Sequence, residues 1–311
     1  MGTVPPRRRL DTMRIHAIFN ARAGTLLDQD KNEFVQSIGR RLRAGGNEVE
    51  VELVEPDEID AATERALAGN IDVLVMGGGD GTIRAAAAKL VGKEIALGII
   101  PLGTLNRLAR DLKIPFDPEE AAAVIAEGER VAIDVADVNG RIFLCTSLLG
   151  LPIRIAEQRQ ALRGSGFGER IRGYMALLHN VLTNRRRFAV EVDDGNVAQS
   201  VRAISIAVSN NPLAETPGMA LTRPRIDSGR LALYLSKHKS GGAMSLGMLR
   251  RMFGKSGSDP EIEELRAKRI VLRSRRAHVQ VSNDGEIEEL NTPLHYSITP
   301  RALRIMAPKS A

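Results

Sequence analysis

The sequence has little cysteine, few aromatic residues and no long apolar run. Cys145 is the only cysteine, which excludes an intramolecular disulfide and a zinc site of several thiolates, and favours a reducing cytosol. Trp is absent and aromatic residues make up 3%, whereas binders of single-stranded nucleic acid interleave basic residues with stacking aromatics. No apolar run approaches the roughly 18 residues that span a bilayer. We therefore expect a cytoplasmic protein without a nucleic-acid partner.

Length and charge indicate a globular protein with an anionic partner. The 311 residues favour two domains at roughly 100–200 residues each, and 43% hydrophobic with 26% charged residues is an ordinary globular composition. Lys and Arg number 44 against 38 Asp and Glu, a net charge of +6. Anionic lipid or nucleotide phosphate fits this charge better than nucleic acid.

The first part of the chain alternates short apolar runs with helix-period segments. Residues 1–12, which contain Arg7, Arg8 and Arg9, predict a disordered basic tail. Strands are predicted at about 14–20, 48–53, 72–76 and 95–100. Helices are predicted at about 30–44, 57–68, 82–91, 105–112 and 117–127. This order predicts an α/β domain with a doubly wound parallel sheet.

The pattern changes from about residue 130. Short β-rich runs are joined by turn signals such as Asn139-Gly140 and Asp284-Gly285, which is typical of an antiparallel β-sandwich. Two helical insertions are predicted, at about 168–184 and 241–253. We thus expect an α/β domain at 13–134, joined by the C-terminal segment 295–311, and a sandwich domain at 135–294.

A glycine-rich turn is the sharpest chemical signal. The buried-strand pattern Ile71–Met76 runs into Gly77-Gly78-Gly79-Asp80-Gly81-Thr82 and then a helix. Glycines let backbone N–H groups approach phosphate oxygens, and a helix N-terminus favours anions. A carboxylate beside phosphates indicates a bridging Mg²⁺, which assigns Asp80 to metal binding. The alternative is a plain tight turn that Asp80 caps.

Two further turns end predicted strands at the same sheet edge. Thr104 and Asn106 in Pro101–Asn106 can bind a nucleotide or fix the loop, and Asn20–Gly24 ends the first strand. Nearby arginines could neutralise phosphate: Arg22, Arg84, Arg107 and Arg110. The glycine spacing fits neither G-x-x-x-x-G-K-[ST] nor G-x-G-x-x-G.

Together with Asp284-Gly285-Glu286, these turns resemble the diacylglycerol kinase catalytic family, which includes bacterial lipid kinases and the sphingosine and ceramide kinases. The resemblance runs from about residue 14 to 308. The Gly-Gly-Asp-Gly core alone is less specific, because NAD kinases and phosphofructokinases share it. Without the family, Asp284-Gly285-Glu286 would be read as a hairpin turn.

The resemblance implies an ATP- and Mg²⁺-dependent kinase. Glu286 falls on the position of the general base. Asp134 matches an acidic position of the metal network, to which Asp80 is also assigned. The residues expected to bind ATP are Asn20, Ala21, Arg22, Ala23, Gly24, Gly78, Gly79, Asp80, Gly81, Thr82, Gly103, Thr104 and Asn106. Three positions depart from the family: Arg84, Arg107 and Ser228. Ser228 stands at an acidic position of the family, so the presence of a second, structural Mg²⁺ near Asp227-Ser228 is left open.

Amphipathic stretches point to a lipid acceptor. Met244, Met248 and Met252 recur every four residues, and a second apolar stripe from Ile171 ends in Arg185-Arg186-Arg187. Such faces suit acyl chains and an anionic leaflet, although packing on the sandwich is the alternative. We expect a peripheral enzyme of the inner membrane face that phosphorylates diacylglycerol, with ceramide or a sphingoid base second.

Two rival functions remain: an NAD kinase-like enzyme with a soluble substrate, and a nucleotide-binding regulator that has lost catalysis. The basic amphipathic stretches argue against the first, and the retained Glu286 and Asp80 argue against the second. The oligomeric state is open, a homodimer included.

Overall fold

The chain forms two compact units. The computed structural model describes residues 12–26, 30–153, 155, 173, 175–176, 179–183, 187–193, 198–214, 222–243 and 261–309. The first unit comprises the chain up to Ile133 together with Ala302 onward, and the second comprises Asp134–Arg301. Strands β5 (Glu129–Val138) and β16 (Leu294–Ala307) each contribute to both units. The C-terminal segment therefore enters the first unit at Ala302, later than the expected residue 295.

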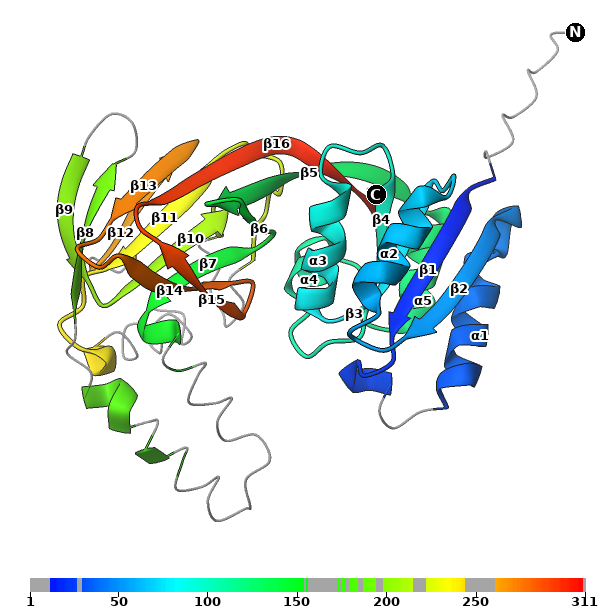
Figure 1. Ribbon diagram of the computed structural model, residues 1–311, viewed down its shortest axis with the longest axis horizontal. Helices are drawn as coiled ribbons and strands as arrows, with labels where there is room; N and C mark the ends of the chain where they lie inside the picture. The colour runs from blue at the N-terminus through cyan, green and yellow to red at the C-terminus, as the bar shows by residue number, and fades with distance from the viewer. Residues whose placement is uncertain are drawn as a thin grey trace, which may run out of the picture. The chain divides into compact units, whose positions relative to one another are not determined.

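The first unit is built on a parallel sheet with the order β2-β1-β3-β4-β16 (Figure 1). Its strands are β1 (Arg14–Asn20), β2 (Glu48–Val54), β3 (Val73–Gly78), β4 (Ala96–Pro101) and the end of β16. Every residue of β3 and β4 is buried, as expected for central strands of a sheet covered on both faces.

The helices of the first unit flank its sheet (Figure 1). They are α1 (Lys31–Leu42), α2 (Ile59–Ala68), α3 (Asp80–Leu90), α4 (Arg107–Asp111) and α5 (Pro118–Glu127), with short 3-10 turns η1 (Gly24–Leu26) and η2 (Ala44–Gly46). Helix α1 contacts α5, and α2 contacts α3. Phe19 of β1 meets Phe34 of α1 edge-to-face at 5.7 Å between ring centroids. The predicted doubly wound α/β fold is confirmed.

Helix boundaries follow local chemistry. The side chain of Asp30 caps α1, and Asp117 caps α5 ahead of Pro118. Helix α1 ends at Leu42, two residues earlier than predicted, and Gly45 and Gly46 follow with positive φ. Helix α3 begins at Asp80, so the glycine-rich turn passes directly into its first turn.

The second unit is an antiparallel β-sandwich, as predicted. One sheet has the order β12-β11-β10-β7-β14-β15, and the other contains β16, β13, β8 and β9, with β5 beside β16 and β6. The strands are β6 (Arg141–Phe143), β7 (Thr146–Gly150), β8 (Phe188–Asp193), β9 (Ala198–Ala203), β10 (Ser205–Asn210), β11 (Leu231–Ser236), β12 (Ile262–Ala267), β13 (Arg269–Arg273), β14 (His278–Asn283) and β15 (Glu286–Asn291). Side chains of both sheets form one core, in which Phe143 meets Tyr296 at 6.1 Å.

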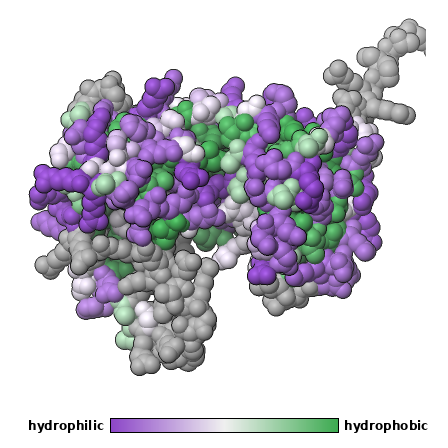
Figure 2. Space-filling view, in the orientation of Figure 1, coloured by the Kyte–Doolittle hydropathy of each residue, from purple (hydrophilic) through white to green (hydrophobic). Residues whose placement is uncertain are grey.

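The two predicted insertions are described only in part. Residues 173, 175–176 and 179–183 are helical, as are 241–243. The methionine stripe Met244–Met252 and the arginines Arg185 and Arg186 lie outside the described residues, as do residues 1–11 of the tail expected at 1–12. Among the described residues, no helix is long and apolar enough to cross a membrane. Hydrophilic residues predominate on the face drawn in Figure 2.

Candidate functional site

Three turns of the first unit meet at the carboxyl ends of β1, β3 and β4. We call residues 20–25, 77–82 and 102–107 the three-turn cradle. The Leu102 N–H donates to the Gly78 carbonyl at 3.0 Å, and the Thr25 hydroxyl donates to the Leu102 carbonyl at 3.2 Å. The Arg107 N–H donates to Oδ1 of Asp80 at 2.7 Å. Hydrogen bonds thus link all three turns that the sequence placed at one edge.

Close packing explains two of the cradle glycines. A Cβ on Gly103 would lie 2.6 Å from the Gly79 Cα, and a Cβ on Gly78 would lie 2.7–2.9 Å from three side-chain atoms of Thr82. No other residue type fits these positions without displacement. The turns after β3 and β4 therefore approach one another backbone to backbone.

The cradle presents the N-terminus of α3, an eleven-residue helix. Its N-cap is Gly79, which supplies no side-chain hydrogen bond. The first N–H groups of a helix have no partner within the helix and carry partial positive charge. A phosphate group is suited to this position.

Asp80 and Asn106 hold the cradle together through backbone contacts. The half-buried Asp80 opens α3, and its carboxylate receives the N–H of the residue that opens α4. Asn106 has a φ of 45°; its Oδ1 accepts the Gly103 N–H at 3.0 Å and its Nδ2 donates to the Gly103 carbonyl at 2.9 Å. Asn106 was expected either to bind a nucleotide or to stabilise the loop, and these contacts match the second role.

Asn20, Arg22 and Thr104, which are also predicted to bind ATP, lie in the same three turns, and Arg110 is one of the arginines near them. Asn20 donates through Nδ2 to the Thr82 hydroxyl at 3.5 Å and accepts the Arg22 N–H at 2.9 Å. Thr104 is exposed. The Arg22 side chain pairs with Glu55 at 2.8 Å, and the Arg110 guanidinium lies 5.6 Å from the centre of the Phe116 ring. These two arginines thus already have partners within the first unit.

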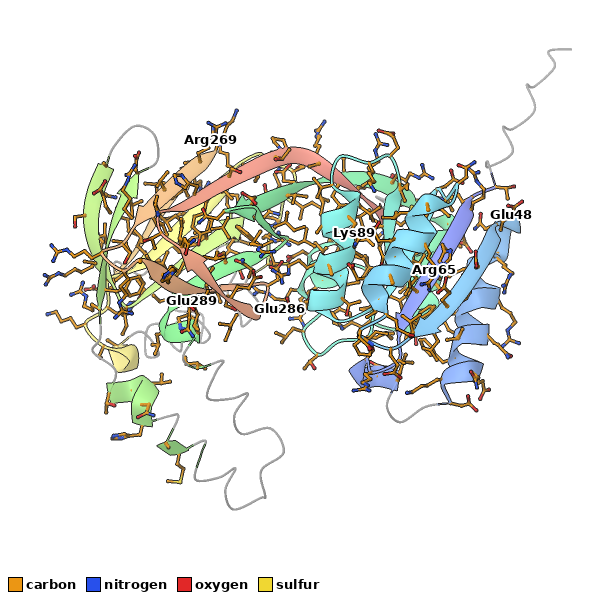
Figure 3. All side chains as sticks on the ribbon, viewed as in Figure 1. Glu48, Arg65, Lys89, Arg269, Glu286 and Glu289 are labelled. Atoms are coloured by element: carbon orange, nitrogen blue, oxygen red, sulfur yellow. The ribbon has the colours of Figure 1, made fainter. Side chains whose placement is uncertain are left out.

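In the second unit, Asp284 and Glu286 lie on a β-hairpin. Asp284 and Gly285 form the turn between β14 and β15 with φ values of 52° and 99°. The Asp284 carboxylate accepts three backbone N–H groups: Leu144 at 2.6 Å, Cys145 at 2.8 Å and Thr146 at 2.9 Å. Glu286 begins β15 and is exposed (Figure 3). The hairpin geometry thus buries one carboxylate and presents the other.

Asp134 lies in a buried polar network of the second unit. It is fully buried, and its two oxygens accept the N–H groups of Gly229 at 2.7 Å and Arg301 at 2.9 Å. Asn210 donates to the carbonyls of Asp134 and Leu144 at 2.9 and 3.0 Å. These contacts of Asp134 join three chain segments. A metal-binding role for Asp134 stays a prediction.

Arg223 and Ser228 complete this network. The buried Arg223 guanidinium donates to the Asn210 carbonyl at 2.9 Å and to the Leu144 carbonyl. Ser228 donates its N–H and hydroxyl to Oδ1 of Asn211 at 2.8 and 2.5 Å. Sequence reasoning missed Asn210 and Arg223, because only their distant carbonyl partners give them a role.

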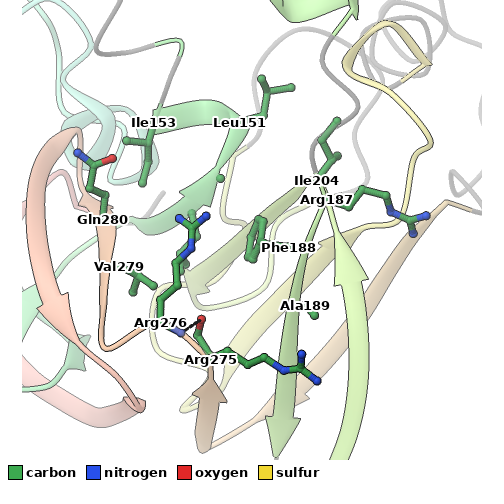
Figure 4. Close-up of a pocket in the computed structure, with 13 residues that line it drawn as sticks. Leu151, Ile153, Arg187, Phe188, Ala189, Ile204, Arg275, Arg276, Val279 and Gln280 are labelled. Carbon is green, nitrogen blue, oxygen red and sulfur yellow. Dashed lines mark hydrogen bonds between the residues drawn. The ribbon is translucent and has the colours of Figure 1, made fainter.

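An apolar cavity of about 730 Å³ lies in the second unit (Figure 4). We call it the arginine-rimmed cavity. Its apolar lining includes Leu149, Leu151, Ile153, Phe188, Ile204 and Val279, and its cationic residues are Arg187, Arg275 and Arg276. Figure 4 shows the Arg276 side chain extending between Val279 and Phe188. Sequence reasoning missed this cavity, although the Ser274-Arg275-Arg276 run was a signal.

The cavity combines an apolar wall with cations. Arg187 donates to the Arg202 carbonyl at 2.8 Å, whereas within the described part of the chain no carboxylate forms an ion pair with Arg275 or Arg276. Strands β7 and β14 lead from the Asp284 turn to the cavity, and five residues from Asp284 to Val279 span roughly 17 Å. A ligand with an apolar chain and a polar head fits this arrangement.

Comparisons with known proteins agree over both units. Residues 14–138 match the family described as diacylglycerol kinase catalytic domain, and residues 156–307 match the YegS C-terminal NAD kinase beta sandwich-like domain. A Pseudomonas aeruginosa protein named "Probable lipid kinase YegS-like" is 28% identical over 90% of this chain and 91% of its own. A Staphylococcus aureus protein named diacylglycerol kinase is 26% identical over 95% and 92%.

A solved structure shows the same fold. It is described as a diacylglycerol kinase from Bacillus anthracis, with a TM-score of 0.68 and 22% identity, and the match covers 96% of this chain and 97% of that one. At this identity the likeness bears on the fold alone. It extends over both units of the chain.

Proposed function

Because this chain belongs to the lipid kinase family that joins a diacylglycerol kinase catalytic domain to a YegS-type sandwich domain, we propose that it transfers the γ-phosphate of ATP to a lipid hydroxyl at a membrane surface. The family implies ATP as the phosphate donor. The observation that carries the lipid assignment is the arginine-rimmed cavity, whose lining is predominantly apolar. A soluble, polar acceptor would gain nothing from that lining.

The three-turn cradle is the proposed nucleotide site. The N-terminus of α3 and the close glycine turns suit phosphate groups. Asp80 would hold Mg²⁺, which supplies positive charge to the nucleotide phosphates when bound. The hydrogen bond from the Arg107 N–H fixes the direction of the Asp80 carboxylate, which keeps this ligand in place before nucleotide binds.

Glu286 is the proposed general base. Its exposed carboxylate takes the proton of the acceptor hydroxyl as the hydroxyl oxygen forms a bond to the γ-phosphorus. The bond from the γ-phosphorus to the β,γ-bridging oxygen breaks, and ADP leaves with that electron pair. The products are a phosphorylated lipid and ADP, and the proton leaves Glu286 to solvent.

Diacylglycerol is the first proposed acceptor, and ceramide or a sphingoid base is the second, since pocket shape decides between them. An anionic inner leaflet suits the cations of the cavity and the net charge of +6. Met175 and Leu182 in the helical insertion are 67% and 45% exposed, which gives the second unit apolar side chains for contact with lipid. The apolar cavity argues against an NAD kinase-like soluble acceptor.

The test is a transfer assay with labelled ATP, Mg²⁺ and one acceptor per reaction: mixed micelles that hold diacylglycerol, ceramide or sphingosine, or NAD in solution. We expect label in one extracted lipid. Glu286→Gln should lower kcat by roughly 10²–10⁴-fold and leave ATP affinity unchanged. Label in NAD but in none of the lipids would refute the lipid assignment. ATP binding without transfer to any acceptor would instead support a catalytically inactive regulator.

A further inference from the structure

A histidine and two glutamates meet on the face of the first sheet that α2 covers. Nε2 of His16 lies 2.8 Å from Oε1 of Glu52, and Nδ1 lies 3.4 Å from Oε2 of Glu50. The parallel register pairs His16 with Glu50, and Glu52 follows two residues later on the same face. One ligand atom from each residue lies within 4.8 Å of the others. None of these residues belongs to the three-turn cradle.

We propose that His16, Glu50 and Glu52 bind a divalent transition-metal cation such as Zn²⁺ or Mn²⁺. One imidazole nitrogen with two carboxylates is a donor set that such cations accept, whereas Mg²⁺ and Ca²⁺ favour oxygen ligands alone. The proposal concerns a site separate from any metal that accompanies nucleotide. It does not depend on the proposed kinase activity.

Two of the three ligands are already held in place. His16 is only 6% exposed, so its ring has little freedom. The other oxygen of Glu52, Oε2, accepts a hydrogen bond from Arg65 of α2 at 2.8 Å, which aims Oε1 at His16 (Arg65 is labelled in Figure 3). Ligand atoms at about 2.1 Å from an ion are about 3.0 Å apart in octahedral and about 3.4 Å apart in tetrahedral geometry. The Glu52 carboxylate, 2.8 Å from His16, would therefore withdraw by a few tenths of an ångström to admit the ion.

The third ligand and the remaining coordination positions have room. The Glu50 side chain is 73% exposed, so it can turn from Nδ1 toward an ion on the Nε2 side. The residues border a cavity of about 520 Å³, large enough for water ligands. Arg14, the other nearby arginine, pairs with Asp72 at 3.2 Å, which directs its charge elsewhere.

The site would join two strands. Strand β2 is the edge of the described sheet, where β1 is its one neighbouring strand, and an ion between His16 and the two glutamates would add a second link between these strands. His16 lies four residues before Asn20 on β1, roughly 13 Å from the cradle. The expected consequence is metal-dependent stability of the first unit, with no direct part in phosphate transfer.

The test uses the full chain, stripped of metal and free of nucleotide. Calorimetric titration with Zn²⁺ and Mn²⁺ should show one saturable site, and the unfolding midpoint should rise by several degrees, whereas Mg²⁺ should bind at least tenfold more weakly. Co²⁺ should give visible absorption bands that Zn²⁺ displaces. Glu50→Gln should weaken Zn²⁺ binding at least tenfold, and His16→Gln should abolish the Co²⁺ bands.

Glu48→Gln is the matched control. Glu48 lies on the same strand and the same face as Glu50 and is exposed, but it is outside the three-residue group (Figure 3). The Glu48→Gln variant loses the same charge as Glu50→Gln and should bind Zn²⁺ as tightly as the wild type does. Equal binding by wild type and Glu50→Gln, or equal weakening in Glu48→Gln and Glu50→Gln, would overturn the proposal. Because Glu50 is exposed, its substitution tests the site even if His16→Gln does not fold.

Discussion

Asp284 and Glu286 are two residues apart and carry the same functional group, but the hairpin places them in opposite environments, one buried and one exposed. Asp284 is only 8% exposed. Its carboxylate accepts three backbone N–H groups, from residues 144–146. Asp284→Asn should place an amide NH₂ against one of these donors. We expect the free energy of unfolding to fall by about 1–3 kcal/mol, measured by denaturant titration.

The control for this prediction is Glu286→Gln, which makes the same carboxylate-to-amide change at an exposed position. Its stability should stay within about 0.5 kcal/mol of the wild type. Equal losses of stability in the two variants would show that the Asp284 hydrogen bonds do not account for the effect. The loss of activity expected for Glu286→Gln has a separate reason, the proposed role of Glu286 as the general base.

Gly103 is the residue at which the cradle has least room. A methyl group there would lie 2.6 Å from the Gly79 Cα, so Gly103→Ala must push the two turns apart. We expect a loss of about 1–3 kcal/mol in stability and weaker binding of ATP, measured by titration. Gly24→Ala is the comparison, because its methyl group would meet only the Leu102 carbonyl at 3.9 Å. Unchanged ATP binding in Gly103→Ala would contradict a tight cradle.

At the scale of elements, local pattern predicted the α/β unit well. The first strand runs from Arg14 to Asn20, as expected, and α5 begins after Asp117 with Pro118 in its first turn. These features are local, because strand alternation and helix caps depend on neighbouring residues. The predicted start of α3, at about residue 82, is two residues late. No local sequence signal indicates that Asp80 already has helical geometry.

Features that depend on distant segments could not be predicted in this way. The partners of Asp284 lie about 140 residues earlier in the chain, and the arginine-rimmed cavity joins residues near 150, 188, 204 and 276. Only strand pairing brings them together, and a single sequence does not specify which strands pair. The cluster of His16 with Glu50 and Glu52 has the same origin, the parallel register of β1 and β2.

An ion pair ties the start of β1 to the start of β3 and predicts a pH effect on stability. Asp72 accepts the Arg14 N–H at 2.8 Å and its Nε at 3.2 Å. Burial raises the pKa of Asp72, but these hydrogen bonds outweigh burial and leave that pKa below its ordinary value. The interaction therefore contributes stability above the unfolded-state pKa, and this contribution is lost as pH falls through the folded-state pKa.

Asp72→Asn tests this effect. We expect it to lower the free energy of unfolding at pH 7 by about 0.5–1 kcal/mol, because the pair is partly exposed. The difference between wild type and variant should shrink as pH is lowered from 5 toward 2, followed by denaturant titration at each pH. A difference that is constant over this range would show that the carboxylate charge is not involved.

At the scale of the whole molecule, the chain enters the sandwich through β5 and returns to the α/β unit through β16. The first unit therefore includes both an early and a late part of the sequence, whereas the second unit is one continuous segment, Asp134–Arg301. The proposed chemistry is divided in the same way: the cradle lies in the first unit, and Glu286 and the cavity lie in the second. Substitutions in one unit should therefore change one substrate's kinetics selectively.

Arg276 gives the clearest test of that division. Its side chain extends into the cavity (Figure 4), and a guanidinium there is suited to an anionic or polar lipid head. Arg276→Gln should raise KM for lipid in mixed micelles several-fold and leave KM for ATP unchanged. Arg269→Gln removes the same charge from an exposed position on β13 that does not line the cavity, and both KM values should stay as in the wild type. If the two variants raise KM for lipid equally, net charge rather than the cavity controls lipid binding; if Arg276→Gln raises KM for ATP instead, the cavity is not the lipid site.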